Sequence, residues 1–310
     1  MDRLSALPTL GVGVMYNPSL PEFLRAELNA LDFLEITPDM FWTNHGPGST
    51  NQYEELESWV EMLDWVVERR PVLAHNIGLS IGNAGRFDQD YVRHIASWHE
   101  RYHFPWHSDH LSFAEVTSSD GQTHNAGVAL PIPLDREALN MVAERVDIVQ
   151  EIVPVPFLLE NGVYFVVYPE QEMTEPQFFN ELTARTGCGI LLDIHNLYAN
   201  ARNHRFDAIE YMRELDLGKV VEAHIAGGSE FAGMYTDAHS GPCPEPVWRL
   251  LEHLVPRAPG LRAITFEFHD SYYHFLGPQG IREQLARARS IFSQYREPSL
   301  DVTGIPTRVV

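Results

Sequence analysis

The sequence is poor in positive charge. Its 310 residues include 22 lysines and arginines against 43 aspartates and glutamates, which gives a formal net charge of −21. Lysine occurs once, as Lys219, and no block of basic residues interrupts the acidic background. Proteins that hold DNA or RNA use such blocks to neutralise phosphates, so we expect no nucleic-acid partner.

Long apolar runs and paired cysteines are also missing. No apolar run reaches the roughly 18 residues that a membrane-spanning helix needs, and the first ten residues lack a basic stretch followed by an apolar one. We therefore expect no membrane partner and a cytoplasmic location. The two cysteines, Cys188 and Cys243, lie far apart and form no CxxC pair. This argues against a disulfide scaffold and a sulfur-ligated zinc site, so any metal must be held by imidazole and carboxylate groups.

Short apolar runs rich in strand-forming residues recur along the chain and alternate with helical patterns. Between them, Leu139, Val142, Val146 and Val149 show the three- and four-residue spacing of an amphipathic helix. Such alternation over about 300 residues predicts an α/β fold, a (β/α)8 TIM barrel. The eight runs occupy residues 10–17, 33–38, 72–78, 107–113, 157–162, 190–196, 220–228 and 264–270.

We expect one catalytic barrel domain over residues 1–297 and a peripheral C-terminal tail over 298–310. Nothing resembling a flexible linker divides the chain. Three longer loops, residues 43–52, 115–133 and 227–246, each follow a predicted strand. Loops of this kind build the active site of a TIM barrel, so we expect all three at its catalytic rim.

Ionisable side chains gather at the ends of six predicted strands. Clustered carboxylates repel one another unless a cation lies among them, and imidazole mixed with carboxylate favours iron, manganese or zinc over calcium. The set is too large for one ion, which indicates two or three. The candidates are His75, His107, Asp109, His110, Glu160, Asp193, Glu222, His224, Glu267 and His269, together with Asp237 and His239 from the loop after the seventh strand.

Several of these residues also have simpler interpretations. A single strand-end histidine is more often a hydrogen-bonded rim residue than a ligand, and Asp193 could cap the next helix. His195 faces away from Asp193 in an ideal strand end unless the chain bends. Glu222 lies deeper, where an ion pair with an arginine is as plausible as a metal. Asn161 and Asn196 suit either amide donors that orient carboxylates or turn residues.

Six spaced fragments resemble a known family. They are HNIGLSIG, SDHLSF, LENGVYF, LLDIHNLYANARNH, EAHIAGG and DAHSGPCPEPVW. These look like the signature blocks of the multinuclear non-haem iron-dependent oxidative enzymes, which include the methanobactin-type peptide-modifying oxidases. The resemblance implies a xylose-isomerase-like barrel, two or three irons and O2 as co-substrate. It also implies oxidation of a ribosomally made precursor peptide, usually at a cysteine held as an iron-bound thiolate, and often a companion peptide-recognition protein.

The resemblance also implies roles for particular residues. Glu160, His224 and Glu267 are expected to be catalytic, with Asn161, His195 and Asn196 supporting the ligands. His195 is a departure, because many relatives have asparagine there. In the fourth strand, alternation places His107 and Asp109 on one face and His110 on the other, and we select the first two. The implied ligands are His75, His107, Asp109, Glu160, Asp193, His224, Asp237, His239 and Glu267.

Three other functions use similar features. Trinuclear zinc enzymes that cut DNA at abasic sites share this type of barrel and ligand set, but a net charge of −21 opposes phosphate binding. Sugar isomerases share the barrel too, and typically use a lysine or histidine near the metals. The single Lys219 is predicted at the opposite end of the seventh strand. A peptide-binding module without activity would need no complete set of ligands, so metal content separates it from the enzymes.

Overall fold

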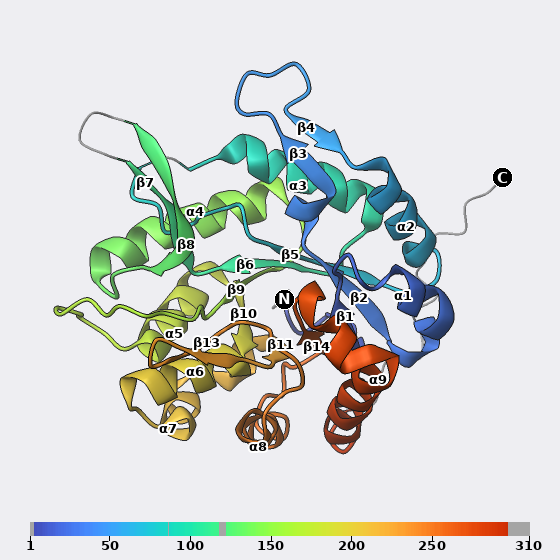
Figure 1. Ribbon diagram of the computed structural model, residues 1–310. Coiled ribbons are helices and arrows are strands. Elements are labelled where there is room, and N and C mark those ends of the chain that lie inside the picture. Colours follow the sequence, from blue (N-terminus) through green and yellow to red (C-terminus); the bar gives the residue numbers. More distant parts are fainter. Residues whose placement is uncertain (1–2, 86, 118–121, 297–310) are drawn as a thin grey trace.

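The strands predicted from the sequence form a closed parallel barrel (Figure 1). The computed structural model describes residues 3–85, 87–117 and 122–296. The fold class is confirmed, whereas the predicted tail, 298–310, lies outside the described residues. In chain order the barrel strands are β1 Gly11–Met15, β2 Phe33–Ile36, β5 Val72–Asn76, β6 His107–His110, β9 Phe157–Glu160, β10 Gly189–Asp193, β11 Val220–Ala226 and β14 Ala263–Glu267.

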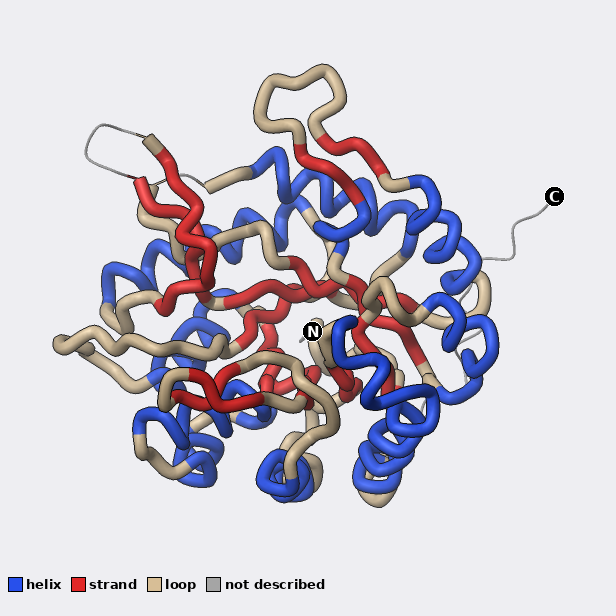
Figure 2. The backbone as a smooth tube through the Cα atoms, in the orientation of Figure 1, coloured by secondary structure: helices blue, strands red, loops and turns tan. Residues whose placement is uncertain are grey.

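Helices surround the strands, as the tube in Figure 2 shows. Their apolar faces pack on the outside of the barrel; in α4 the predicted positions Leu139, Val142, Val146 and Val149 are all buried. None of the helices in the described ranges is long and apolar enough to cross a membrane. The α-helices are α1 Pro21–Glu27, α2 Glu57–Val67, α3 Gln89–Tyr102, α4 Arg136–Ile152, α5 Glu175–Thr186, α6 Ile194–His204, α7 Ala208–Glu214, α8 Glu245–Leu254 and α9 Tyr273–Phe292; the 3-10 helices are η1 Leu28–Ala30, η2 Pro38–Phe41, η3 Leu217–Lys219 and η4 Asp270–Tyr272.

The three long loops each follow a barrel strand, as expected, but they are not irregular. Each belongs to an antiparallel hairpin, which the turn-rich sequence of the loops concealed. After β2 come β3 Trp42–Asn44 and β4 Tyr53–Glu55, after β6 come β7 Ser112–Thr117 and β8 Thr123–Pro131, and after β11 come β12 Ser229–Phe231 and β13 Met234–Thr236.

The barrel interior has two chemically different layers. A lower layer of apolar side chains is separate from the core that lies between strands and helices. Side chains two residues apart on a strand share a face, so the next inward position lies nearer the carboxyl ends of the strands. There Phe33 is followed by Glu35 and Leu158 by Glu160. The lower layer consists of Leu4, Leu10, Phe33, Leu73, Trp106, Leu158, Leu191, Val221 and Ala263.

Candidate metal centre

Two imidazole rings meet the carboxylate of Glu160, at the end of β9. His75 Nε2 from β5 and His110 Nε2 from β6 each lie 3.1 Å from Glu160 Oε2. His75 and Glu160 are buried, whereas the His110 side chain is 26% exposed. The Ser108 hydroxyl lies 2.9 Å from His75 Nδ1, so the other ring nitrogen faces the carboxylate. This arrangement leaves Glu160 Oε2 and two imidazole nitrogens converging on one point.

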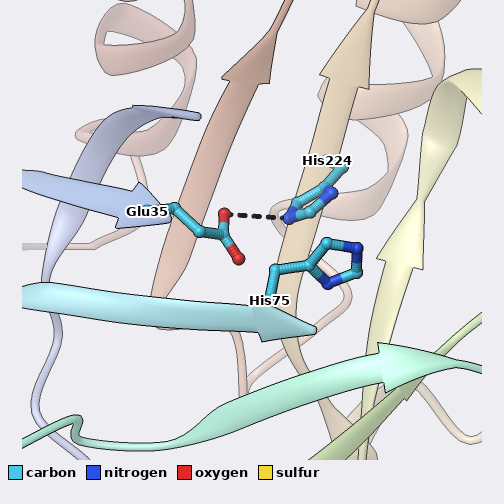
Figure 3. A group of neighbouring side chains, drawn as sticks. All are labelled: Glu35, His75 and His224. Atoms are coloured by element: carbon cyan, nitrogen blue, oxygen red, sulfur yellow. Dashed lines mark hydrogen bonds and ion pairs between the residues drawn. The ribbon is translucent and has the colours of Figure 1, made fainter. Parts of the chain in front are cut away.

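Glu35 and His224 extend this cluster across the barrel, as Figure 3 shows for Glu35, His75 and His224. His224 Nε2 lies 3.0 Å from Glu35 Oε2, and His224 Nδ1 lies 3.3 Å from Glu267 Oε2. Both Glu35 and His224 are fully buried. Glu35 was not among the residues predicted from the sequence. The sequence feature that could have identified it is a carboxylate inside the apolar run FLEI, two residues after Phe33 and therefore on the same inward face of the strand.

The turn from β10 into α6 brings three more polar groups to the centre. Asp193 ends the strand and caps the helix, because its Oδ1 accepts a 2.8 Å hydrogen bond from the backbone N–H of Asn196. The chain bends there, so His195 lies on the same side as Asp193, although alternation along a straight strand would place the two on opposite faces. His195 Nδ1 lies 2.9 Å from Asp237 Oδ1. Asn196 Nδ2 donates to Glu160 Oε1 at 3.2 Å. Asn161 holds the bend in place, since its amide group pairs with the backbone N–H and carbonyl of Asp193.

The segment after β13 closes the other side of the centre. His239 Nε2 lies 2.9 Å from Asp237 Oδ1 and 3.6 Å from Glu267 Oε2. His239 has φ of 47°, which is unusual for a residue with a side chain. Its carbonyl accepts a 2.9 Å hydrogen bond from the His269 amide and so fixes this segment against the end of β14.

The selection made within β6 was wrong about which face points inward. His107 lies outside the cluster, with its ring 4.8 Å from that of Phe157 and its Nδ1 facing Asn76. Asp109 Oδ2 accepts from the Leu79 amide and its Oδ1 from the His110 amide. The alternation itself was correct, but neighbouring strands place His110, not His107 or Asp109, toward Glu160.

Two other candidates have side chains below or outside the cluster. Glu222 lies below His224, with its Oε1 3.9 Å from His224 Nε2, and none of the described arginines pairs with it. Trp106 Nε1 donates to Glu222 Oε2 at 2.7 Å and the Thr265 hydroxyl to Oε1 at 3.1 Å. The His269 side chain is 64% exposed and caps η4 through Ser271. Burial and the nearby Glu35 raise the pKa of Glu222 well above its usual value, so a neutral Glu222 suits this depth.

The surroundings lower the pKa of some carboxyl groups in the centre and raise that of others. Burial raises the pKa of Glu160, but the neighbouring imidazoles of His110 and His75 outweigh this and lower it to about 2. Burial, together with the negative charge of Glu160 and Asp237, raises the pKa of Asp193 well above its usual value. For His239, burial lowers the pKa, while Asp237 and Glu267 raise it to about 10. Without a metal ion, protons bound by groups such as Asp193 and His239 therefore reduce the negative charge of this cluster.

The side chains present fit metal ions. Glu160 Oε2, His224 Nδ1 and His239 Nε2 meet only the ion-pair partners given above, which are themselves ligand groups. Three further ligand atoms, all buried, lack a hydrogen-bond partner among the described residues: Glu35 Oε1, Asp193 Oδ2 and His195 Nε2. Such atoms are costly in a folded interior unless they coordinate something. Three overlapping groups have ligand atoms within 4.8 Å of one another: Glu35 with His75 and His224, His75 with His110 and Glu160, and Glu160 with Asp193 and His224. The groups overlap at His75, Glu160 and His224, so they form one continuous cluster.

Comparisons with solved structures agree on the fold. Endonuclease IV from Thermus thermophilus superposes with a TM-score of 0.51 at 15% identity, covering 92% of this chain and 98% of that one. D-psicose 3-epimerase from Clostridium cellulolyticum superposes with a TM-score of 0.57 at 11% identity, covering the same shares. At such low identity, these similarities establish the barrel alone.

Sequence relatives are closer. A UPF0276 protein of Caulobacter vibrioides is 34% identical over 240 residues, which are 77% of this chain and 80% of the relative. A UPF0276 protein of Rhizorhabdus wittichii is 32% identical over 248 residues, 80% and 83% of the two chains. The profile of a family described as RiPP precursor modification enzyme MbnB/TglH/ChrH matches residues 10–291.

Proposed function

We propose a function on the basis that this chain belongs to the MbnB/TglH/ChrH family of RiPP precursor modification enzymes. The proposed function is oxidative modification of a ribosomally made precursor peptide by O2 at a centre of two or three iron ions, most often at a cysteine. The observation that carries it is the convergence of buried imidazole and carboxylate groups with unpartnered ligand atoms at the barrel mouth.

Iron suits the chemistry of these side chains. The cluster offers nitrogen and oxygen ligands and no sulfur, a mixture that favours iron, manganese or zinc over calcium and magnesium. Of these, iron bound here would supply redox chemistry with O2, which zinc cannot do. We propose His75, His110, Glu160, Asp193, His224, Asp237, His239 and Glu267 as ligands, with Glu35 added from the geometry.

The other side chains would orient these ligands. Asn196 holds one oxygen of Glu160 and leaves the second directed at His75 and His110. His195 Nδ1 lies 2.9 Å from Asp237 Oδ1, while its Nε2 lies beside Gly228, so His195 would position Asp237. Asn161 fixes the backbone at Asp193. Such partners set the direction and basicity of a ligand, so Asn161, His195 and Asn196 are proposed as supporting residues.

A peptide cysteine would be the thiol ligand, because the protein's own cysteines are unsuited to that role. Cys188 and Cys243 are both buried, and burial raises the pKa of Cys188 to about 11 and that of Cys243 well above its usual value. Neither cysteine belongs to the groups of converging ligand atoms in the described part of the chain, whereas a substrate thiol that reached the metals would lose its proton on coordination. Glu160, His224 and Glu267 are proposed as the residues on which turnover depends.

The decisive experiment combines metal analysis with peptide mass spectrometry. Protein purified without oxygen should contain more than one iron per chain, and a precursor peptide should change mass after oxygen is added. The same peptide with its cysteine replaced by serine should keep its mass, because a hydroxyl is a weaker ligand with a higher pKa. Stoichiometric zinc without iron, together with cleavage of abasic DNA, would contradict the proposal.

A further inference from the structure

A large cleft opens directly from the metal centre. Its volume is about 750 Å³, within the range of small-ligand and peptide-binding sites. His110, Asn196 and Asp237 belong both to the cleft lining and to the centre or its supporting residues. The cleft is therefore continuous with the metal centre and leads from it toward the outer surface over α5 and α7.

The walls of the cleft nearest the hairpin β7–β8 are apolar and accessible. β8 contributes Val128 and Leu130, and the segment after β9 contributes Val163, Val166 and Val167. Val128, Val166 and Val167 are 48%, 55% and 53% exposed. Exposed apolar side chains grouped in one cleft indicate that a ligand covers them, because their burial releases about 25 cal/mol for each Å² of apolar surface.

The far end of the cleft is acidic. Asp207, Glu210 and Glu214, at and within α7, line it. Glu175 at the start of α5 lines it too, but burial raises the pKa of Glu175 to about 7. The basic residue on this side, Arg213, already pairs with Glu210. The Tyr211 hydroxyl lies in the same wall beside Glu175 and has no other partner in the described part of the chain. This end therefore has a surplus of negative charge and a buried hydroxyl without a second partner.

We propose that this cleft selects precursor peptides by the residues that flank the target: an apolar side chain beside it, against Val128 and Val167, and a basic side chain further along, at Glu210 and Glu214. The assignment rests on the proposed function, since it takes the peptide to be the ligand. A peptide whose target residue reaches the metals must leave through the open side of the centre, and this cleft adjoins it. Its charge complements a cationic segment.

Synthetic peptides test the selectivity without any turnover. Each peptide carries a fluorescein label and a central cysteine in a Gly-Ser background. The residue beside the cysteine is leucine or serine. One residue further along, on either side of the cysteine, is lysine or glutamate, and its position is varied across the panel. Binding to the protein as purified is measured by fluorescence anisotropy without oxygen. We expect the best leucine–lysine peptide to bind roughly three- to tenfold more tightly than its glutamate counterpart at low salt, with the difference shrinking at high salt.

A charge exchange locates this preference in the cleft. The double variant Glu210→Lys and Glu214→Lys should favour the glutamate peptide. The matched control is Glu57→Lys with Glu61→Lys, which has the same spacing on exposed positions of α2, outside the cleft, and changes the net charge equally. It should keep the preference for lysine.

A second pair of variants tests the apolar wall. Val167→Asn should reduce the difference between leucine and serine peptides, whereas Phe231→Asn should not, since Phe231 is 75% exposed on the β12–β13 hairpin and outside the cleft. Equal affinities across the panel, no detectable binding, or the same response to both charge exchanges would overturn the assignment.

The two proposals fail in different ways. If the peptides bind with the expected preference but keep their mass after oxygen is added, the proposed function is wrong and the cleft assignment stands. If peptides are modified regardless of the residues beside the cysteine, the function stands and the assignment is wrong.

Discussion

The two layers inside the barrel come from the same strands but perform opposite tasks. On β9, Leu158 and Glu160 are both buried and share a face two residues apart, yet one belongs to the apolar lower layer and the other to the metal centre. The same step separates Leu191 from Asp193 on β10 and Phe33 from Glu35 on β2. Burial alone therefore does not distinguish the residues that stabilise this protein from those that provide its chemistry.

The two layers differ in the contacts that compensate their side chains for the loss of water. An apolar side chain in the lower layer is satisfied by close packing, and its burial contributes about 1.5–3 kcal/mol. A carboxyl group of the metal centre, which forms the upper layer, has lost its water and lies among other ionisable groups, and Asp193 Oδ2 has no hydrogen-bond partner among the described residues. We infer that the lower layer stabilises the metal-free fold while the upper layer costs stability until metal ions bind. Substitutions in each layer test this contrast.

The largest effect is expected from Glu160→Gln. The substitution removes the carboxylate on which His75 and His110 converge, so iron content should fall severely and peptide modification should drop below detection. Elemental analysis and peptide mass spectrometry measure both. Chelation should lower the melting temperature of the wild-type protein but leave that of the variant unchanged. Glu57→Gln, at an exposed position, is the control, and full iron content in Glu160→Gln would refute the assignment.

The next comparison uses the two faces of β6. His110→Ala should reduce iron content, because His110 faces Glu160. His107→Ala should retain iron and lose the packing of its ring against Phe157 and its contact with Asn76. Metal analysis of both purified variants decides between the faces, and loss of iron from His107→Ala alone would restore the assignment made from the sequence.

In the lower layer, Leu158→Ala should cost about 2–5 kcal/mol of unfolding free energy by leaving a cavity. Denaturant unfolding of the metal-free protein measures this loss. The variant that remains folded should still bind iron, because Leu158 touches the apolar layer and contributes no ligand atom. A smaller cost than that of Glu160→Gln under the same conditions would reverse the proposed division between the layers.

The smallest effect concerns Asp193→Asn in the metal-free protein. Burial first, and then Glu160 and Asp237, raise the pKa of Asp193, so the folded state keeps a proton that the unfolded chain releases above about pH 4. Wild-type stability then falls as pH rises, whereas asparagine does not titrate and still caps α6. The variant's advantage in melting temperature should grow by roughly a few °C between about pH 5 and pH 8. An advantage independent of pH would contradict this electrostatic account.

Much of the centre was predictable because its residues stand at strand ends. Polar groups that follow buried runs, such as His75, Glu160 and Glu267, must gather where parallel strands end together. Glu35 was missed because it lies within an apolar run and its partner, His224, is 189 residues away. The direction of His195 depended on the bend at Asp193, where the chain leaves the strand and begins α6.

Local spacing and side-chain chemistry were enough to predict the eight strands, the alternation of their faces and the kinds of ligand available. Tertiary contacts were needed to establish which face of β6 points inward, that Glu35 meets His224 and that a cleft adjoins the centre. Alternation along a strand has two equivalent phases, and a strand considered alone contains nothing to choose between them. Closure of the barrel makes that choice, because each strand's hydrogen bonds to its neighbours fix which of its faces surrounds the axis.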